Sequence, residues 1–106
     1  MLGRLRVKNQ ERTQEWDPEN KLSALFFAVE LAGEVGEALN VIKKLEREKH
    51  DIPGSRATAG DLGEELADII IVVDIIAAHY GIDLEFCIKD KFNKTSKGRC
   101  FKTCLE

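Results

Sequence analysis

The segment from Ile69 to Ala78 most constrains how this chain can fold. It is apolar except for Asp74, and in a helix its side chains would point in nearly every direction around the axis. A helix that is apolar on all sides must be buried on all sides, and the other short helices of a 106-residue chain can scarcely surround it. We therefore expect an all-α fold, a short helical bundle of three to four helices completed by homo-oligomerisation, with this helix in the interface of at least a homodimer.

Glycine and proline divide the rest of the chain into helices, and no alternating run predicts a strand. Asp17-Pro18 predicts a helix start, because aspartate can cap free N–H groups and proline at the first helical position loses no hydrogen bond. This helix should continue to about Glu48. Residues 1–16 can add a short N-terminal helix.

Two further helices follow from capping residues. Thr58 with Asp61 three positions later resembles a capping box, and the helix it opens should stop at Gly81. Asp83 should cap a last helix that runs to about Phe92, after which residues 95–106 are predicted to be irregular. The length predicts one domain over residues 1–106.

Charge and cysteine content limit the function classes. The net charge of −3 argues against a general nucleic-acid or anionic-membrane surface, and the Ile69–Ala78 run is too short to span a bilayer. The basic stretch from Lys89 to Lys102 would suit either a bound polyphosphate or a solvated tail. Three cysteines without a C-x-x-C pair disfavour a disulfide framework or structural zinc and predict a cytoplasmic location.

Acidic side chains form one stripe on each of the two long helices. At about 100° per residue, three glutamates share a face of the first helix, and apolar residues continue that face. The second helix repeats the arrangement, while Glu64 and Asp74 should lie outside or at another interface. The stripes comprise Glu30, Glu34 and Glu37 with Phe26, Phe27 and Val41, and Asp61, Glu65 and Asp68 with Val72, Ile75 and Ile76.

Stability alone does not explain these stripes. Like charges one turn apart disfavour a helix, and partial burial adds to that cost. Gly33 and Gly36 further weaken the first helix, so we expect another backbone to approach closely there. The alternatives are a solvated acidic face or pairing with lysines, since Lys44 lies on the same face as Glu37. Clustered carboxylates without histidine or cysteine favour hard cations, Mg²⁺ or Mn²⁺.

The two acidic motifs together resemble a known signature. Glu34-Val35-Gly36-Glu37 and Glu65-Leu66-Ala67-Asp68 form an E-x-x-E … E-x-x-D pair, and Lys91-Phe92-Asn93-Lys94 looks like a downstream Lys/Asn element. The chain in this respect resembles the MazG-like, all-α nucleoside triphosphate pyrophosphohydrolase superfamily. The resemblance implies a dimer or a homotetramer (a dimer of dimers) that cleaves the α–β bond of an NTP or dNTP to give the monophosphate and pyrophosphate.

The resemblance also implies roles for individual residues. It implies Mg²⁺ ligands at Glu34, Glu37, Glu65 and Asp68, and contacts to phosphates or sugar from Lys91 and Asn93; Lys94 and Lys44 are further substrate-binding candidates. Glu34 or Glu30 could accept the proton of the attacking water. Trp16 could stack on a nucleobase, or it could clamp the N-terminal segment onto the bundle.

Three functions remain open from the sequence. The first is a nucleotide-pool, house-cleaning hydrolase with an unspecified NTP or dNTP substrate. The second is phosphoribosyl-ATP pyrophosphohydrolase, which cleaves the same kind of bond. The third is a catalytically silent helical module that binds a metal ion or nucleotide and acts through a partner protein.

Overall fold

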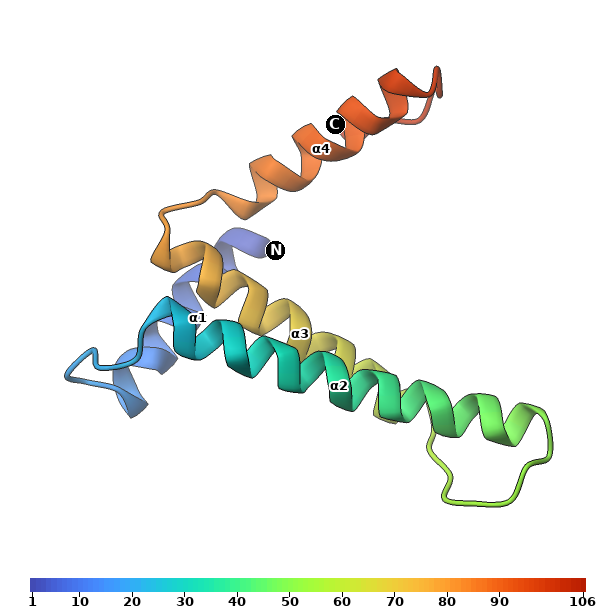
Figure 1. Ribbon diagram of the computed structural model, residues 1–106. Coiled ribbons are helices and arrows are strands. Elements are labelled where there is room, and N and C mark those ends of the chain that lie inside the picture. The colour runs from blue at the N-terminus through green and yellow to red at the C-terminus, as the bar shows by residue number, and fades with distance from the viewer.

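A computed structural model describes residues 1–106 and contains four α-helices and no strand. The helices are α1 (Leu2–Trp16), α2 (Ala24–Lys49), α3 (Ala59–His79) and α4 (Leu84–Gly98). Figure 1 shows α2 and α3 lying side by side as a long hairpin, α1 crossing one end of it, and α4 pointing away. The prediction of an all-helical chain is confirmed. No helix combines the length and the apolar character that a membrane span requires.

The capping box that begins α3 is confirmed. The Thr58 side chain accepts a hydrogen bond from the Asp61 N–H at 3.1 Å, and the Asp61 carboxylate accepts one from the Thr58 N–H at 2.8 Å. The helix ends at His79, just before Gly81, whose φ of 64° allows the chain to turn back. The capping box and Gly81 therefore predicted where this helix begins and ends.

The predicted start of α2 at Asp17-Pro18 is wrong. Asp17 instead follows the last residue of α1, and its carboxylate accepts hydrogen bonds from the Lys21 and Leu22 N–H groups at 2.9 Å each. Asn20 adopts a left-handed φ of 54°, which a continuous helix cannot contain. The helix begins only after Ser23, whose hydroxyl accepts a hydrogen bond from the Phe26 N–H.

The start of α4 is confirmed and its predicted end is wrong. The Asp83 carboxylate accepts a hydrogen bond from the Phe86 N–H at 3.0 Å, as a cap should. The helix continues past Phe92 to Gly98, so only the last residues of the chain are irregular. Asn93 holds this tail: its side chain exchanges two hydrogen bonds with the backbone of Leu105, at 2.9 and 2.7 Å.

The hydrophobic core of the single chain is small. Only five hydrophobic residues are buried, and they join α2 to α3: Phe27, Ala38, Val41, Val72 and Ala77. The radius of gyration is 17.3 Å, whereas a compact domain of this length would have about 13 Å. Large apolar side chains are exposed on all four helices, with Val7 51%, Leu25 74%, Ile70 50% and Phe86 65% accessible.

The close backbone approach expected at Gly33 and Gly36 does not occur within the chain. A Cβ atom at either position would meet nothing within 4 Å. The reason is that α2 packs on α3 through Phe27, Ala38 and Val41, while both glycines are exposed. The glycines therefore do not explain how the two acidic stripes come together.

Candidate active site

Glutamates from α2 and α3 form an acidic cluster at the centre of the hairpin. One carboxylate oxygen from each of Glu34, Glu37 and Glu65 lies within 4.8 Å of the others. Glu34 and Glu37 are one turn apart on α2, and Glu65 faces them from α3. The structure therefore brings together three of the four carboxylates predicted to share a site.

Two oxygens of the acidic cluster are buried without a partner. Glu34 Oε2 and Glu65 Oε2 are out of contact with solvent and accept no hydrogen bond. A buried acceptor left unpaired is unfavourable, so such atoms usually serve a purpose other than stability. Burial raises the pKa of Glu34, as do the nearby charges of Glu37, Asp68 and Glu65. Burial and the neighbouring Glu37 raise the pKa of Glu65.

These carboxylates fit a divalent cation. They supply only oxygen donors, two of those oxygens are unpaired, and the cluster lacks histidine and cysteine. Hard cations such as Mg²⁺ prefer such donors and retain further positions for water or phosphate oxygens. A cation would also offset the repulsion between carboxylates, which adds to the effect of burial in raising both pKa values.

The raised pKa values predict how stability depends on pH. Above the ordinary glutamate value of 4.5, Glu34 and Glu65 keep a proton in the folded chain that they lose in the unfolded chain. The native state then binds more protons, so the free energy of unfolding should fall as the pH rises through this window. Because a cation requires deprotonated ligands, the stabilisation by Mg²⁺ should grow over the same window.

Thermal unfolding in EDTA and in Mg²⁺, from about pH 4.5 to about pH 8, measures both trends. A Glu34→Gln, Glu65→Gln double variant should lose most of the pH dependence of stability in EDTA and most of the stabilisation by Mg²⁺. If the double variant keeps the full pH dependence in EDTA, other groups cause it. Asp17 and Asp61 do not interfere, because backbone hydrogen bonds lower their pKa values below 3.8.

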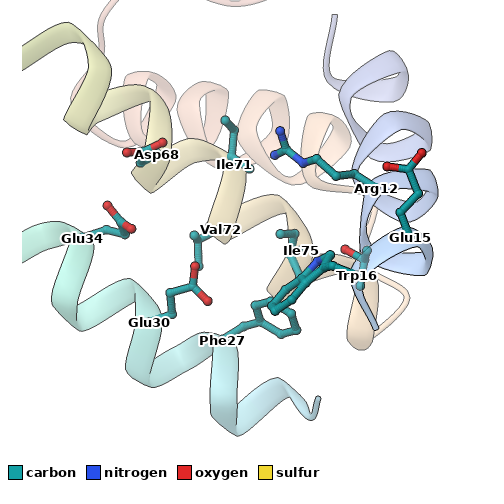
Figure 2. A pocket seen from close by; sticks show the side chains of 11 residues that line it. Arg12, Glu15, Trp16, Phe27, Glu30, Glu34, Asp68, Ile71, Val72 and Ile75 are labelled. Atoms are coloured by element: carbon teal, nitrogen blue, oxygen red, sulfur yellow. The ribbon is translucent and has the colours of Figure 1, made fainter. Parts of the chain in front are cut away.

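A pocket of about 430 Å³ lies beside the acidic cluster, between α1, α2 and α3. We call it the inter-helix pocket. Figure 2 shows the Glu34 and Asp68 carboxylates at one end, projecting from α2 and α3, and the Trp16 indole at the other end. The acidic lining residues are Glu15, Glu30, Glu34 and Asp68, and the apolar ones include Phe27, Ile71, Val72 and Ile75.

Asp68 and Glu30 extend the acidic character into this pocket. Asp68 is exposed and lies outside the 4.8 Å cluster, although it is close enough to raise the pKa of both Glu34 and Glu65. Glu30 is half-buried and lies one turn before Glu34 on α2. Both residues can therefore reach a ligand that bridges the pocket and the acidic cluster.

Trp16 both packs and lines the pocket. Its ring centroid lies 6.4 Å from that of Phe26 and 6.2 Å from that of Phe27, the latter in an edge-to-face arrangement. The indole is still 54% exposed. Its packing holds the end of α1 against α2, and its remaining surface is accessible from the inter-helix pocket.

A buried polar network attaches α1 to α3. Asp74 is only 1% exposed and accepts hydrogen bonds from Arg6 Nε at 3.1 Å and Asn9 Nδ2 at 3.0 Å. Asn9 Nδ2 also donates to the Ile71 carbonyl at 3.2 Å. The sequence predicted Asp74 either on the outside or at another interface. The structure places it at an interface, between α1 and α3.

Sequence reasoning named Trp16 as a binding candidate and missed the other residues that α1 contributes to the pocket. Arg12 and Glu15 line it together with Trp16. One signal was present: a lone aspartate in an apolar helix needs a partner, and Arg6 and Asn9 lie on one face of the N-terminal helix. Docking that face on α3 places the later turns of α1 over the acidic stripe.

Four predicted substrate-binding residues do not line the pocket in the single chain. Lys44 is half-buried further along α2. Its charge is close enough to Asp61 to contribute, after the hydrogen bonds from Thr58, to the lowered pKa of that carboxyl. Asn93 uses its side chain to hold Leu105, and Lys94 forms an ion pair with Asp90 at 2.7 Å. Lys91 is exposed on α4, the helix that points away from the hairpin in Figure 1.

The family assignment agrees with this geometry. The sequence of residues 24–100 matches the family of the MazG nucleotide pyrophosphohydrolase domain. Because the match covers most of the chain, the protein belongs to the MazG family. No curated protein and no solved structure matches the chain. Helix α1, with Arg12 and Trp16, lies before the matched residues.

Proposed function

We propose that this chain is a Mg²⁺-dependent nucleoside triphosphate pyrophosphohydrolase, which cleaves the α–β phosphoanhydride to release pyrophosphate and a monophosphate. The observation that carries the proposal is the acidic cluster with its unpaired buried oxygens, set at one end of a pocket that has an aromatic side chain at the other. A triphosphate needs cationic neutralisation and a nucleoside needs an apolar platform. The inter-helix pocket offers one feature for each.

Five acidic residues have a place in this mechanism. Glu34, Glu37 and Glu65 would hold Mg²⁺, with Asp68 completing the set from the pocket side. The ion would neutralise the polyphosphate and favour loss of a proton from water. The base that accepts this proton is Glu30 or Glu34; an unchanged kcat in Glu30→Gln would leave Glu34.

Trp16 would stack on the base of the substrate. It is half-exposed, and Phe26 and Phe27 hold its ring from behind, which limits the entropy lost when a base binds. We also propose that residues 1–106 form one domain, since α1 packs on α3. The predicted cytoplasmic location stays a prediction.

We further propose that the active form is a homodimer or homotetramer. The core is small, and α2, α3 and α4 all expose large apolar side chains, which a second copy would bury. Helix α4 extends from the rest of the chain, so its Lys91 and Lys94 could reach the inter-helix pocket of a partner subunit. This arrangement would retain a substrate-binding role for the Lys/Asn element.

Light scattering at micromolar concentration tests the assembly. We expect a mass at least twice the 11.9 kDa of one chain. Replacing the exposed Phe86 by glutamate should shift the mass toward that of the monomer, because a charge cannot be buried in an apolar interface without a partner. A monomeric mass for the unmodified protein would contradict the proposal.

Pyrophosphate release from a substrate panel tests the activity. The panel contains the NTPs, the dNTPs, oxidised and deaminated forms, and phosphoribosyl-ATP, each with Mg²⁺ and with EDTA. We expect turnover of at least one member with Mg²⁺ and none with EDTA. If no member is hydrolysed although nucleotide binds, the silent binding module becomes the better description.

A further inference from the structure

Helix α1 supplies side chains to the inter-helix pocket although it precedes the residues that match the family. Arg12, Glu15 and Trp16 all line the pocket, and the match begins only at residue 24. The family match therefore assigns these three residues no role. Of the three, the proposed function uses only Trp16, and Arg12 is the one that can bind an anion.

Arg12 is the only positively charged residue that lines the inter-helix pocket. The other charged lining residues are the four carboxylates of Glu15, Glu30, Glu34 and Asp68. Arg12 nevertheless forms no ion pair with any of them, and its side chain is exposed. Its five N–H donors are thus available to an anionic ligand.

The position of Arg12 suggests which anion it meets. It lies one helical turn before Trp16 on α1, so both side chains project from the same face. Figure 2 shows its guanidinium extending from α1 toward Ile71, on the side of the pocket where Asp68 lies. A ligand that spans the pocket from the indole to the acidic end would pass this guanidinium.

We propose that Arg12 binds the phosphate attached directly to the nucleoside. This inference rests on the proposed function and adds a residue that binds its substrate. With the base on Trp16 and the terminal phosphates at the acidic cluster, the α-phosphate lies between them. Guanidinium and phosphate form charge-assisted, often bidentate hydrogen bonds. Without Arg12, every charged side chain that lines the pocket would be a carboxylate.

A nucleoside monophosphate isolates this contact, because it keeps the α-phosphate and lacks the pyrophosphate. Isothermal titration calorimetry in Mg²⁺ would measure the affinities for AMP, GMP, CMP and UMP and for the four matching nucleosides. Arg12→Ala should weaken the best monophosphate by about tenfold to a hundredfold, the range for a lost hydrogen bond to a charged group. The affinity of the Arg12→Ala variant for the matching nucleoside should stay within about twofold of that of the unmodified protein.

Two further variants sharpen the result. Arg12→Lys should have an intermediate affinity, because lysine keeps the charge and loses the bidentate geometry. Lys8→Ala is the matched control: it removes a positive charge one turn earlier on α1, from a residue that pairs with Glu11 at 2.8 Å and does not line the pocket. The control should bind the monophosphate like the unmodified protein.

Several outcomes would overturn the inference. Arg12→Ala could leave the affinity for the monophosphate unchanged, or lower the affinities for nucleoside and monophosphate equally. Lys8→Ala could lower the affinity for the monophosphate as much as Arg12→Ala does. The unmodified protein could also bind monophosphates no better than nucleosides. The test is separable from that of the proposed function. A chain that hydrolyses nothing but binds monophosphates through Arg12 would contradict only the activity, whereas an active enzyme that ignores Arg12 would contradict only this inference.

Discussion

The Asp68→Asn variant should lose nearly all hydrolysis while its metal-free form stays as stable as the unmodified protein or becomes more stable. Asp68 is exposed, forms no ion pair, and raises the pKa of Glu34 and Glu65 through its charge. Removing that charge relieves repulsion and breaks no favourable contact. We expect hydrolysis to fall by about a hundredfold or more, since loss of even an outer partner of a metal site costs about 10–100-fold.

Two measurements on each variant decide this prediction. Thermal unfolding in EDTA should give an equal or higher Tm for Asp68→Asn, and the Tm increase on adding Mg²⁺ should shrink. Glu64→Gln is the control, because it removes a neighbouring exposed charge on α3 that is outside the acidic cluster. A lower Tm in EDTA together with retained Mg²⁺-dependent activity would reject a metal-binding role for Asp68.

The elements that the sequence predicted well are those with local causes. The capping box at Thr58 and the cap at Asp83 involve residues three positions apart, so their hydrogen bonds hardly depend on the rest of the fold. The spacing of Glu34 and Glu37 likewise places them on one helix face whatever packs there. Only the antiparallel pairing of α2 with α3 was needed to bring a carboxylate oxygen of Glu65 within 4.8 Å of those of Glu34 and Glu37.

The start of α2 was mispredicted because two local structures compete for the same residue. An aspartate before a proline can cap a helix, and it can equally accept hydrogen bonds from the N–H groups of a turn. Here the carboxylate binds the Lys21 and Leu22 N–H groups and Ser23 supplies the cap. Both sites have suitable cap chemistry, so the sequence pattern alone could not choose between them.

The part of the pocket formed by α1 depends on tertiary contacts. The location of Arg12 and Trp16 follows from how α1 crosses α3, and Asp74 determines that crossing through residues more than sixty positions away. The place of Lys91, Asn93 and Lys94 has a different cause. Within the chain, Asn93 holds Leu105 and Lys94 pairs with Asp90 on the same helix, while α4 makes few contacts with the other helices and does not approach the pocket.

The Arg6→Met variant should be destabilised by about 3–5 kcal/mol, the cost of leaving one member of a buried ion pair without its partner. Asp74 is 1% exposed and the Arg6 side chain 22%, so water cannot easily replace the lost guanidinium. Arg6 Nη2 also donates to the Ile82 carbonyl at 2.8 Å, which ties α1 to the turn before α4. This loss is a large fraction of the stability of a typical domain, about 5–15 kcal/mol.

The double variant Arg6→Met, Asp74→Leu distinguishes an unpaired charge from a general packing defect. With both charged groups replaced by apolar ones, no unpaired charge remains between α1 and α3, and Asn9 keeps its hydrogen bond to the Ile71 carbonyl. Urea unfolding should therefore show the double variant to be more stable than Arg6→Met alone, with a clear coupling between the two substitutions. Arg4→Met, at an exposed position on α1 without an ion pair, should change stability little. If the two substitutions instead destabilise additively, the Arg6–Asp74 pair does not hold α1 on α3, and the pocket that places Arg12 and Trp16 must depend on other contacts.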